Sequence, residues 1–187
     1  MPPAHRRSDI GSGHSCHFPP TLATGGSPNT FVNNKPLMMK SDRYGIDKEF
    51  CRRNGCRIFF GVDWLDDAEF EAFEAFFGSR QLFVSSGDKP LEGASVSSFS
   101  EAVKLESGFV DEDKYILSPN DALIYVSDDR DVFLVAASSE RLATLIAEIS
   151  ARGGRTYSSL VRTGTIEPKK QVRAYFDYWA DLNFEID

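Results

Sequence analysis

The sequence predicts an α+β fold in which a small, turn-rich β segment is followed by an acidic α+β domain. This expectation rests on three features of the sequence. Gly, Pro, Ser, Thr and Asn are concentrated in residues 1–45, short apolar runs alternate with helical stripes after residue 57, and the net charge changes sign between these parts. Residues 1–57 contain nine Lys and Arg against four Asp and Glu, whereas residues 58–187 contain twelve against twenty-four. We therefore expect two domains, 1–57 and 58–187.

The first 45 residues have the composition of tight turns between very short strands. Only residues 29–33 (NTFVN) read as a strand, and Asn33-Asn34 reads as the turn after it. The sequence therefore predicts a β segment with little regular structure in this part of the chain.

From Arg57 the pattern changes to longer elements. Residues 57–62 (RIFFGV) are predicted as a strand, and Asp66 and Asp67 open a helix because negative charge suits a helix N-terminus. Gly78 is expected to end that helix. Residues 80–85 read as a second strand, and residues 86–119 carry no clear pattern. The apolar stripe of the helix repeats at steps of three and four residues and consists of Phe70, Phe73, Phe76 and Phe77.

The last third begins with two predicted strands, 122–126 and 131–137, around a hairpin turn at residues 127–130. Ser139 is expected to cap a helix that Gly153-Gly154 ends. A short strand at residues 156–161 and a final helix at residues 168–182 follow. The buried faces of the two helices are predicted from their spacing as Leu142, Leu145, Ile146 and Ile149 in the first, and Val172, Tyr175, Phe176 and Trp179 in the second.

The overall composition, with 41% hydrophobic and 26% charged residues, is that of a soluble globular chain. The longest apolar runs are five or six residues, against the roughly 20 that a bilayer span needs, so we expect no membrane insertion by the chain itself. The first residues lack the apolar core of a secretory signal. We expect a cytoplasmic protein, or one exported by a route that reads no signal peptide. Nucleic acid is not an expected partner, because residues 58–187 have no basic face.

All histidines and cysteines lie in the first 57 residues, which points to a metal site there. His14, Cys16 and His17 fall within four residues, and Cys51 and Cys56 follow. Zinc takes four such ligands in a tetrahedron, usually from two chain segments, so the spacing allows a His/Cys zinc site. The spacing matches no zinc-finger or ribbon signature. The alternative is that the histidines are exposed turn residues and the cysteines are small buried side chains.

Residues 9–42 resemble the first half of a proline-alanine-alanine-arginine (PAAR) repeat domain. The run from Gly26 to Pro36 (GSPNTFVNNKP) is the most specific part of the likeness, because many turn residues agree in register. At the place of the name-giving motif this chain has Pro36-Leu37-Met38-Met39, and no second half follows Tyr44. The other motifs that carry the resemblance are Asp9, Ser12-Gly13-His14-Ser15-Cys16, Pro19-Pro20 and Ser41-Asp42.

The PAAR family forms the sharpened tip of contractile injection machines, which are phage tail spikes and type VI secretion spikes. The resemblance implies a small pyramid of short strands with a zinc ion near its apex, and it gives a ligand role to His14 and Cys16. It also implies a trimeric spike protein as partner, and either delivery by the contractile machine or a place in a virion. The first expected function is therefore a structural spike-tip protein that carries an α+β passenger domain.

The acidic domain contains neither His nor Cys, so it lacks the commonest general base and the commonest thiol nucleophile. Two acidic clusters, residues 111–113 and 128–131, could bind a hard cation or be solvated loops. Acidic surfaces suit a basic protein partner, so an immunity or adaptor role beside a basic effector is the second expectation. A delivered effector enzyme is the third, with no catalytic residue assigned, and the sequence holds none of the common nucleotide-binding or hydrolase motifs.

Overall fold

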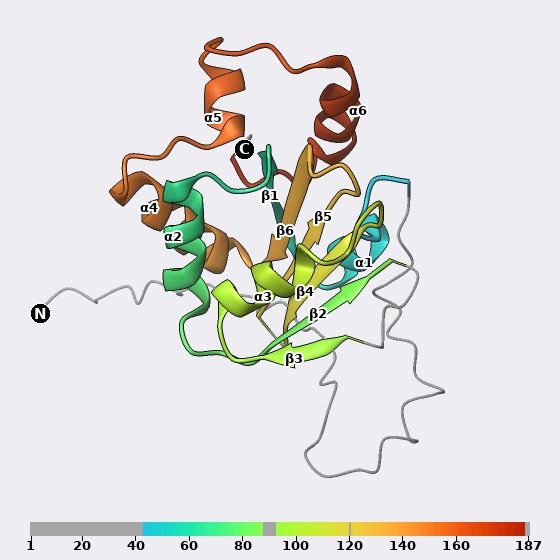
Figure 1. Cartoon of the computed structure of the whole chain (residues 1–187). Coiled ribbons are helices and arrows are strands. Elements are labelled where there is room, and N and C mark those ends of the chain that lie inside the picture. Colours follow the sequence, from blue (N-terminus) through green and yellow to red (C-terminus); the bar gives the residue numbers. More distant parts are fainter. Residues whose placement is uncertain (1–42, 88–92, 120, 186–187) are drawn as a thin grey trace, which may run out of the picture.

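The computed structural model describes residues 43–87, 93–119 and 121–185. The predicted strand at residues 29–33, the PAAR-like motifs and three predicted metal ligands, His14, Cys16 and His17, lie outside these residues. Within them the α+β class is confirmed, because helices combine with one six-stranded antiparallel sheet (Figure 1). No helix among the described residues is long and apolar enough to cross a membrane.

The described chain runs in the order α1, β1, α2, β2, β3, α3, β4, β5, β6, α4, α5, α6. The strands are β1 (Arg57–Val62), β2 (Leu82–Ser86), β3 (Ala94–Val96), β4 (Lys114–Ser118), β5 (Ala122–Val126) and β6 (Val132–Ala137). The helices are α1 (Lys48–Arg53), α2 (Asp67–Phe77), α3 (Phe99–Glu106), α4 (Ser139–Ala151), α5 (Tyr157–Arg162) and α6 (Lys170–Trp179).

The strands are ordered β1-β6-β5-β4-β2-β3, and each neighbouring pair is antiparallel. Strands β5 and β6 lie inside the sheet, and every residue of both is buried. In their register Ala122 pairs with Ala137 and Val126 with Phe133. Because successive side chains point to opposite faces, strands that are buried throughout need cover on both sides of the sheet.

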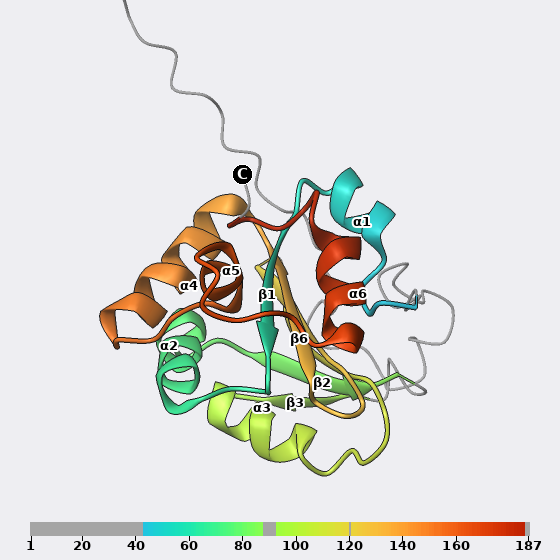
Figure 2. The same ribbon diagram turned by 90° about the horizontal axis from the view of Figure 1, so that it is seen from above.

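One face of the sheet is covered by α2, α3 and α4, and its core is rich in phenylalanine (Figure 2). The ring of Phe99 from α3 stacks on Phe73 and Phe77 from α2, with centroids 5.3 and 5.4 Å apart. Phe73 also meets Phe133 of β6 edge-on, at 6.1 Å. Aromatic pairs of this kind add about 0.5–1.5 kcal/mol each beyond the burial of their surface. Phe73, Phe76 and Phe77 of the predicted stripe are therefore confirmed on the buried side of α2, and Phe70 is partly buried beside them.

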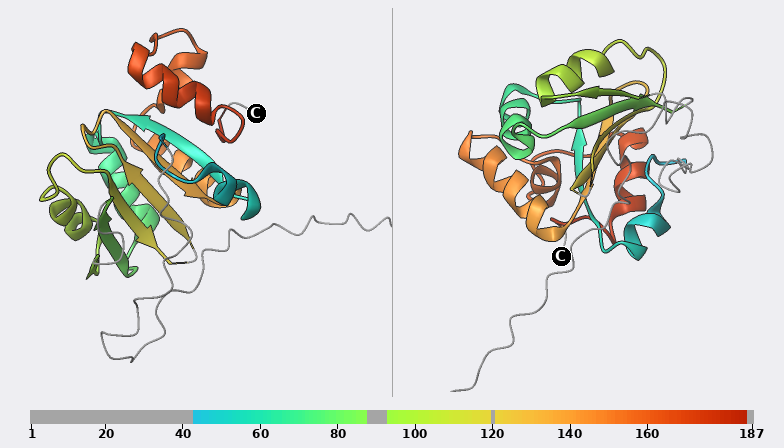
Figure 3. Two further views of the ribbon diagram at one scale, coloured as in Figure 1. Left: turned by 90° about the vertical axis from the view of Figure 1, so that its right-hand side faces the viewer. Right: turned by 90° about the horizontal axis from the view of Figure 1, so that it is seen from below.

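The opposite face is covered by α1 and α6, which lie side by side in Figures 2 and 3. Val172 and Trp179 of α6 are buried against the sheet, and Phe50 of α1 joins them. The outer edge of β1 is covered by α5 and by the C-terminal segment. There Ile58 N–H donates to Leu182 O (2.8 Å) and Phe184 N–H donates to Ile58 O (2.9 Å). The edge of β1 is thus partly paired by the chain's own C-terminal residues.

Most predicted elements of the acidic domain are confirmed with small shifts at their ends, but residues 156–161 are helix α5 and not a strand. Thr156 caps this helix, because its Oγ1 accepts from Ser159 N–H (3.2 Å). The β-branched and aromatic residues that suggested a strand are the ones that α5 turns toward β1. The cap of α4 is Ser138 rather than Ser139. The unassigned residues 86–119 contain β3, α3 and β4.

The segment from Tyr44 to Cys56 packs into the same core as β1, across the predicted boundary at residues 57 and 58. The predicted zinc ligands Cys51 and Cys56 are 0% and 1% exposed and lie among apolar side chains. Trp179 Nε1–H donates to Tyr44 O (3.1 Å). Lys48 Nζ lies 2.5 Å from Asp181 Oδ1. Helix α1 is therefore part of the layer that α6 builds.

We predict that the chain beginning at Arg43 folds, whereas the chain beginning at Ile58 is strongly destabilised. The shorter chain loses the buried side chains of Ile46 and Phe50, each worth about 1.5–3 kcal/mol, and exposes Trp179. The combined loss of roughly 5 kcal/mol is comparable with the whole stability of many domains. Urea unfolding followed by circular dichroism measures it, and equal midpoints for the two chains would contradict this assignment of α1.

A buried carboxylate at the start of α2 makes the stability of the fold depend on pH. Glu69 is 7% exposed and forms a capping box with Asp66: Glu69 N–H donates to Asp66 Oδ1 (2.7 Å) and Asp66 N–H donates to Glu69 Oε2 (3.2 Å). Burial raises the pKa of Glu69 to about 7, and the charges of Asp66 and Asp63 act in the same direction. The folded chain therefore keeps a proton on Glu69 that the unfolded chain loses at lower pH.

We predict that the free energy of unfolding falls by on the order of 3 kcal/mol through Glu69 as the pH rises from about 4.5 to about 7. Glu69→Gln should remove this contribution, because the amide oxygen still accepts from Asp66 N–H but does not ionise. Glu74→Gln, exposed on the same helix, is the matched control and should keep it. Urea unfolding across this pH range gives the comparison. The same pH dependence in Glu69→Gln as in the unmodified chain would show the prediction to be wrong.

Candidate functional site

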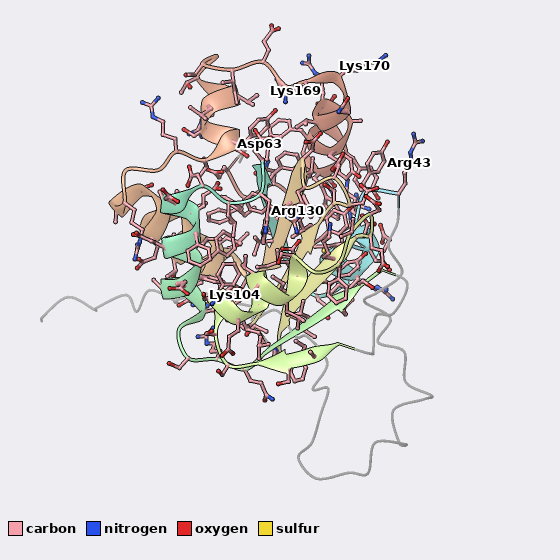
Figure 4. All side chains as sticks on the ribbon, viewed as in Figure 1. Arg43, Asp63, Lys104, Arg130, Lys169 and Lys170 are labelled. Atoms are coloured by element: carbon pink, nitrogen blue, oxygen red, sulfur yellow. The ribbon has the colours of Figure 1, made fainter. Side chains whose placement is uncertain are left out.

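Three loops that are distant in sequence meet at one end of the sheet, where β1 and β5 end and β4 begins. They are residues 63–65, 107–113 and 127–131, and we call them together the loop end. Asp63 N–H donates to Asp131 O (3.2 Å), and Trp64 N–H donates to Arg130 O (3.1 Å). Figure 4 shows Asp63 and Arg130 on the same side of the molecule. The first loop is thus fastened to the third through the backbone.

Unfavourable backbone conformations are concentrated in the loop end. Among the residues that the structure describes, the non-glycine residues with positive φ are Asp63 (53°), Leu65 (50°), Asp111 (56°) and Arg130 (61°). A left-handed backbone costs a non-glycine residue roughly 1–2 kcal/mol, so the surrounding contacts must hold these residues in place. Such conformations gather at functional sites, and we therefore treat the loop end as the candidate site.

The turn between β5 and β6 is held by a buried lysine of β4 and by hydrogen bonds within the turn itself. Lys114, the first residue of β4, is 1% exposed, and its Nζ donates to Asp128 O (2.9 Å). Ser127 Oγ donates to Asp129 Oδ1 (2.6 Å), and the same carboxylate oxygen accepts from Asp131 N–H (3.0 Å). A buried ammonium and an internal carboxylate therefore set the shape of the turn, which keeps Arg130 in place.

Beneath the loops lies a buried ion pair between Glu106, at the end of α3, and Arg130. Glu106 is 0% exposed, and Arg130 Nε lies 3.2 Å from Glu106 Oε1. Within the described part of the chain, neither carboxylate oxygen has a well-formed hydrogen bond. Burial raises the pKa of Glu106, and the opposing effects of Arg130, Lys114 and the Trp64 indole are smaller. The carboxylate is thus held in a place that suits its neutral form better.

A second network joins the loop end to α6. Tyr125 Oη donates to Asp113 Oδ1 (3.0 Å), and Tyr175 of α6 is hydrogen-bonded to Tyr125. Burial raises the pKa of both tyrosines, so both hydroxyls stay protonated. Burial also raises the pKa of Asp113, although the Tyr125 hydroxyl opposes that change. The network therefore fixes the position of α6 relative to the loops.

The solvent side of the loop end is acidic and carries an exposed apolar side chain. Asp63, Asp111 and Asp128 are exposed and Glu112 is half-buried. In the part of the chain that the structure describes, the carboxylates of Asp63, Asp111 and Glu112 have no hydrogen-bond or ion-pair partner. Val110 is 72% exposed, and no other large hydrophobic side chain described is exposed. Figure 4 shows the basic residues 169 and 170 at the start of α6.

The described residues do not form the metal site that the sequence predicted. Cys51 and Cys56 lie in the core, and no group of three or more His, Cys, Asp or Glu in the described ranges is arranged to hold a metal ion. The His/Cys zinc site thus stays a prediction, since its three other residues lie outside those ranges. The acidic clusters 111–113 and 128–131 do come together at the loop end, although not as a cation site.

Sequence reasoning missed the buried charges of the site, because Glu106 and Lys114 fall in the stretch that carried no clear pattern. One signal could have located Glu106. Phe99, Ala102 and Glu106 are spaced by three and four residues, which places Glu106 on the buried face of α3. Its partnership with Arg130 depends on the packing of α3 beside the β5–β6 turn, which spacing alone does not specify.

A comparison of the chain with protein-family models, curated proteins and solved structures found no significant match.

Proposed function

We propose that the described domain is a protein-binding domain, of the adaptor or immunity type, that takes a basic protein partner at the loop end. The observation that carries the proposal is the combination of exposed, unpaired carboxylates with Val110 on loops that are held in unfavourable backbone conformations. Exposed carboxylates and an exposed apolar side chain on the same set of loops are the kinds of group found in the polar rim and the apolar centre of an interface.

Fixed loops favour binding because little conformational entropy remains to be lost. The backbone bonds between the first and third loops, and the internal bonds of the β5–β6 turn, are already formed in the isolated chain. Preorganisation of this kind improves affinity by reducing the cost of ordering the interface. The acidic surface in turn speeds the approach of a basic partner and disfavours acidic ones.

The groups available in the described residues support binding more than catalysis. These residues contain no histidine, and both of their cysteines are buried in the core. Lys114 and Glu106 are covered by the loops and face each other and Arg130 rather than solvent. A general acid or base must reach its substrate within hydrogen-bond distance, which these covered groups do not do. The effector-enzyme hypothesis therefore has less support than the binding role.

We predict that Glu112→Lys weakens binding of the basic partner about tenfold or more, because it reverses one charge of the loop end at a residue without a left-handed backbone. The probe is the most basic protein encoded beside this chain, titrated against the purified full chain by calorimetry. Affinity should also fall steeply as the salt concentration is raised, because exposed charges are screened.

The matched control is Glu74→Lys, which makes the same charge change on the exposed side of α2 away from the loop end. We expect it to change the affinity by less than about twofold. An equal loss of affinity in Glu74→Lys would show that net charge, and not the loop end, governs binding. Binding that needs only residues 1–42 would contradict the proposal altogether.

A second role is supported by the sequence of residues 9–42. We propose that this segment makes the chain a PAAR-like spike-tip protein of a contractile machine, with the α+β domain as its passenger. The support is the register of turn residues in Gly26–Pro36, together with the other PAAR-like motifs of residues 9–42. The expected partner at the segment is a trimeric spike protein.

We predict that the purified full chain contains about one zinc ion per chain, because a cone of this size cannot build an adequate apolar core without a metal. Elemental analysis measures the zinc content. The double variant His14→Ala and Cys16→Ala should lose the metal. Cys51→Ala, in the core of the passenger domain, is the comparison that shows whether Cys51 is also a ligand. Zinc-free protein in which the segment is folded would contradict the metal site.

A further inference from the structure

Glu106 occupies the point at which the three loops of the loop end meet. Three groups face its carboxylate: Arg130 from the β5–β6 turn, Lys114 from β4, and the indole of Trp64 from the β1–α2 loop. The carboxylate has no access to water, and neither of its oxygens has a well-formed hydrogen bond within the described residues. An ionised carboxylate in such a place is paired but poorly solvated.

The groups around Glu106 are also those that hold the loops together. Arg130 O accepts from Trp64 N–H, and Arg130 N–H donates to Ser127 O (3.0 Å). The Arg130 side chain, 38% exposed, reaches down from this backbone to Glu106. A change in the charge of Glu106 therefore acts directly on the first and third loops.

We propose that the loop end is a pH-sensitive latch, which is closed while Glu106 is protonated and loosens as Glu106 ionises. In the closed form the neutral carboxylic acid fits its dry surroundings. Once Glu106 ionises, the anion is better solvated if the loops separate enough to admit water. The latch is a property of the chain by itself, whereas its use to adjust partner binding rests on the proposed function.

The sign of the effect follows from linkage. Burial raises the pKa of Glu106 in the closed form above the ordinary value of 4.5 that an open, solvated form would have. The closed form therefore binds the proton more tightly, and acidification favours it. The closed form is fully favoured below about pH 4.5 and loses this advantage as the pH rises through the raised pKa of Glu106. The ratio of closed to open forms falls about tenfold for each unit by which the two pKa values differ.

The test uses the full chain and two signals from Trp64, its indole resonance and the exchange protection of its backbone N–H. Glu69 also titrates near this loop, so Glu69→Gln is the background in which Glu106→Gln is compared. In Glu69→Gln alone, Trp64 protection, corrected for intrinsic exchange, should fall about tenfold or more as the pH is raised through the midpoint at which the Glu106 carboxyl titrates. Addition of Glu106→Gln should keep the protection high at every pH. Trp179, in α6, supplies the reference indole signal.

Two further measurements test whether Glu106 controls the latch. Arg130→Met should enlarge the pH-dependent loss of Trp64 protection, because the guanidinium is one of the groups that lower the pKa of Glu106. Direct titration of the Glu106 carboxyl by carbon-13 NMR in the unmodified chain should give the same midpoint as the Trp64 indole. The proposal is overturned if that carboxyl titrates at or below about 4.5. It is equally overturned if Glu106→Gln unfolds, or loses protection at all pH values as a simple structural ion pair would require.

Discussion

The burial of β5 and β6 on both faces is the constraint on which the rest of this structure depends. Every side chain of these strands is covered, so the chain must supply one helical layer for each side of an antiparallel sheet. Helices α2, α3 and α4 form the first layer with their phenylalanine core. The second layer is complete only when α1 joins α6, which is why residues 44–56 belong to the folded domain although their charge and composition group them with the N-terminal segment.

The same constraint places the polar chemistry at the ends of the strands. With both faces of the sheet covered, loops at the strand ends are where charged residues can gather next to ordered backbone, and the loop end does this with four left-handed residues. Its inner side contains Glu106, Lys114 and Arg130, whose charges partly balance one another, while its outer side presents carboxylates and Val110. On the proposed function, the inner groups support the loops and the outer carboxylates contact the partner.

The elements with a strong hydrophobic periodicity could be predicted from the sequence. The prediction failed where tertiary contacts determine the secondary structure. The phenylalanine stripe of α2 and the apolar runs of β1, β5 and β6 could be read directly, because their spacing matches a helix or a buried strand. The strand predicted at residues 156–161 is wrong, since Tyr157 and Val161 favour a strand locally, while the Thr156 cap and packing on β1 produce helix α5. The acidic clusters were recognised as candidates, but their meeting depends on the β4–β5 register, and the strain of Asp63 or Arg130 has no signature in residue type.

The loop end is the surface at which we propose that a basic partner binds. The most direct measurement is NMR chemical-shift mapping of the full chain as the purified basic partner is added. We expect the largest changes to fall on residues 63–65, 107–113 and 127–131, with Val110 among them, and to vanish at high salt. Changes confined to the outer surface of α6, to the free edge of β3 or to residues 1–42 would contradict it.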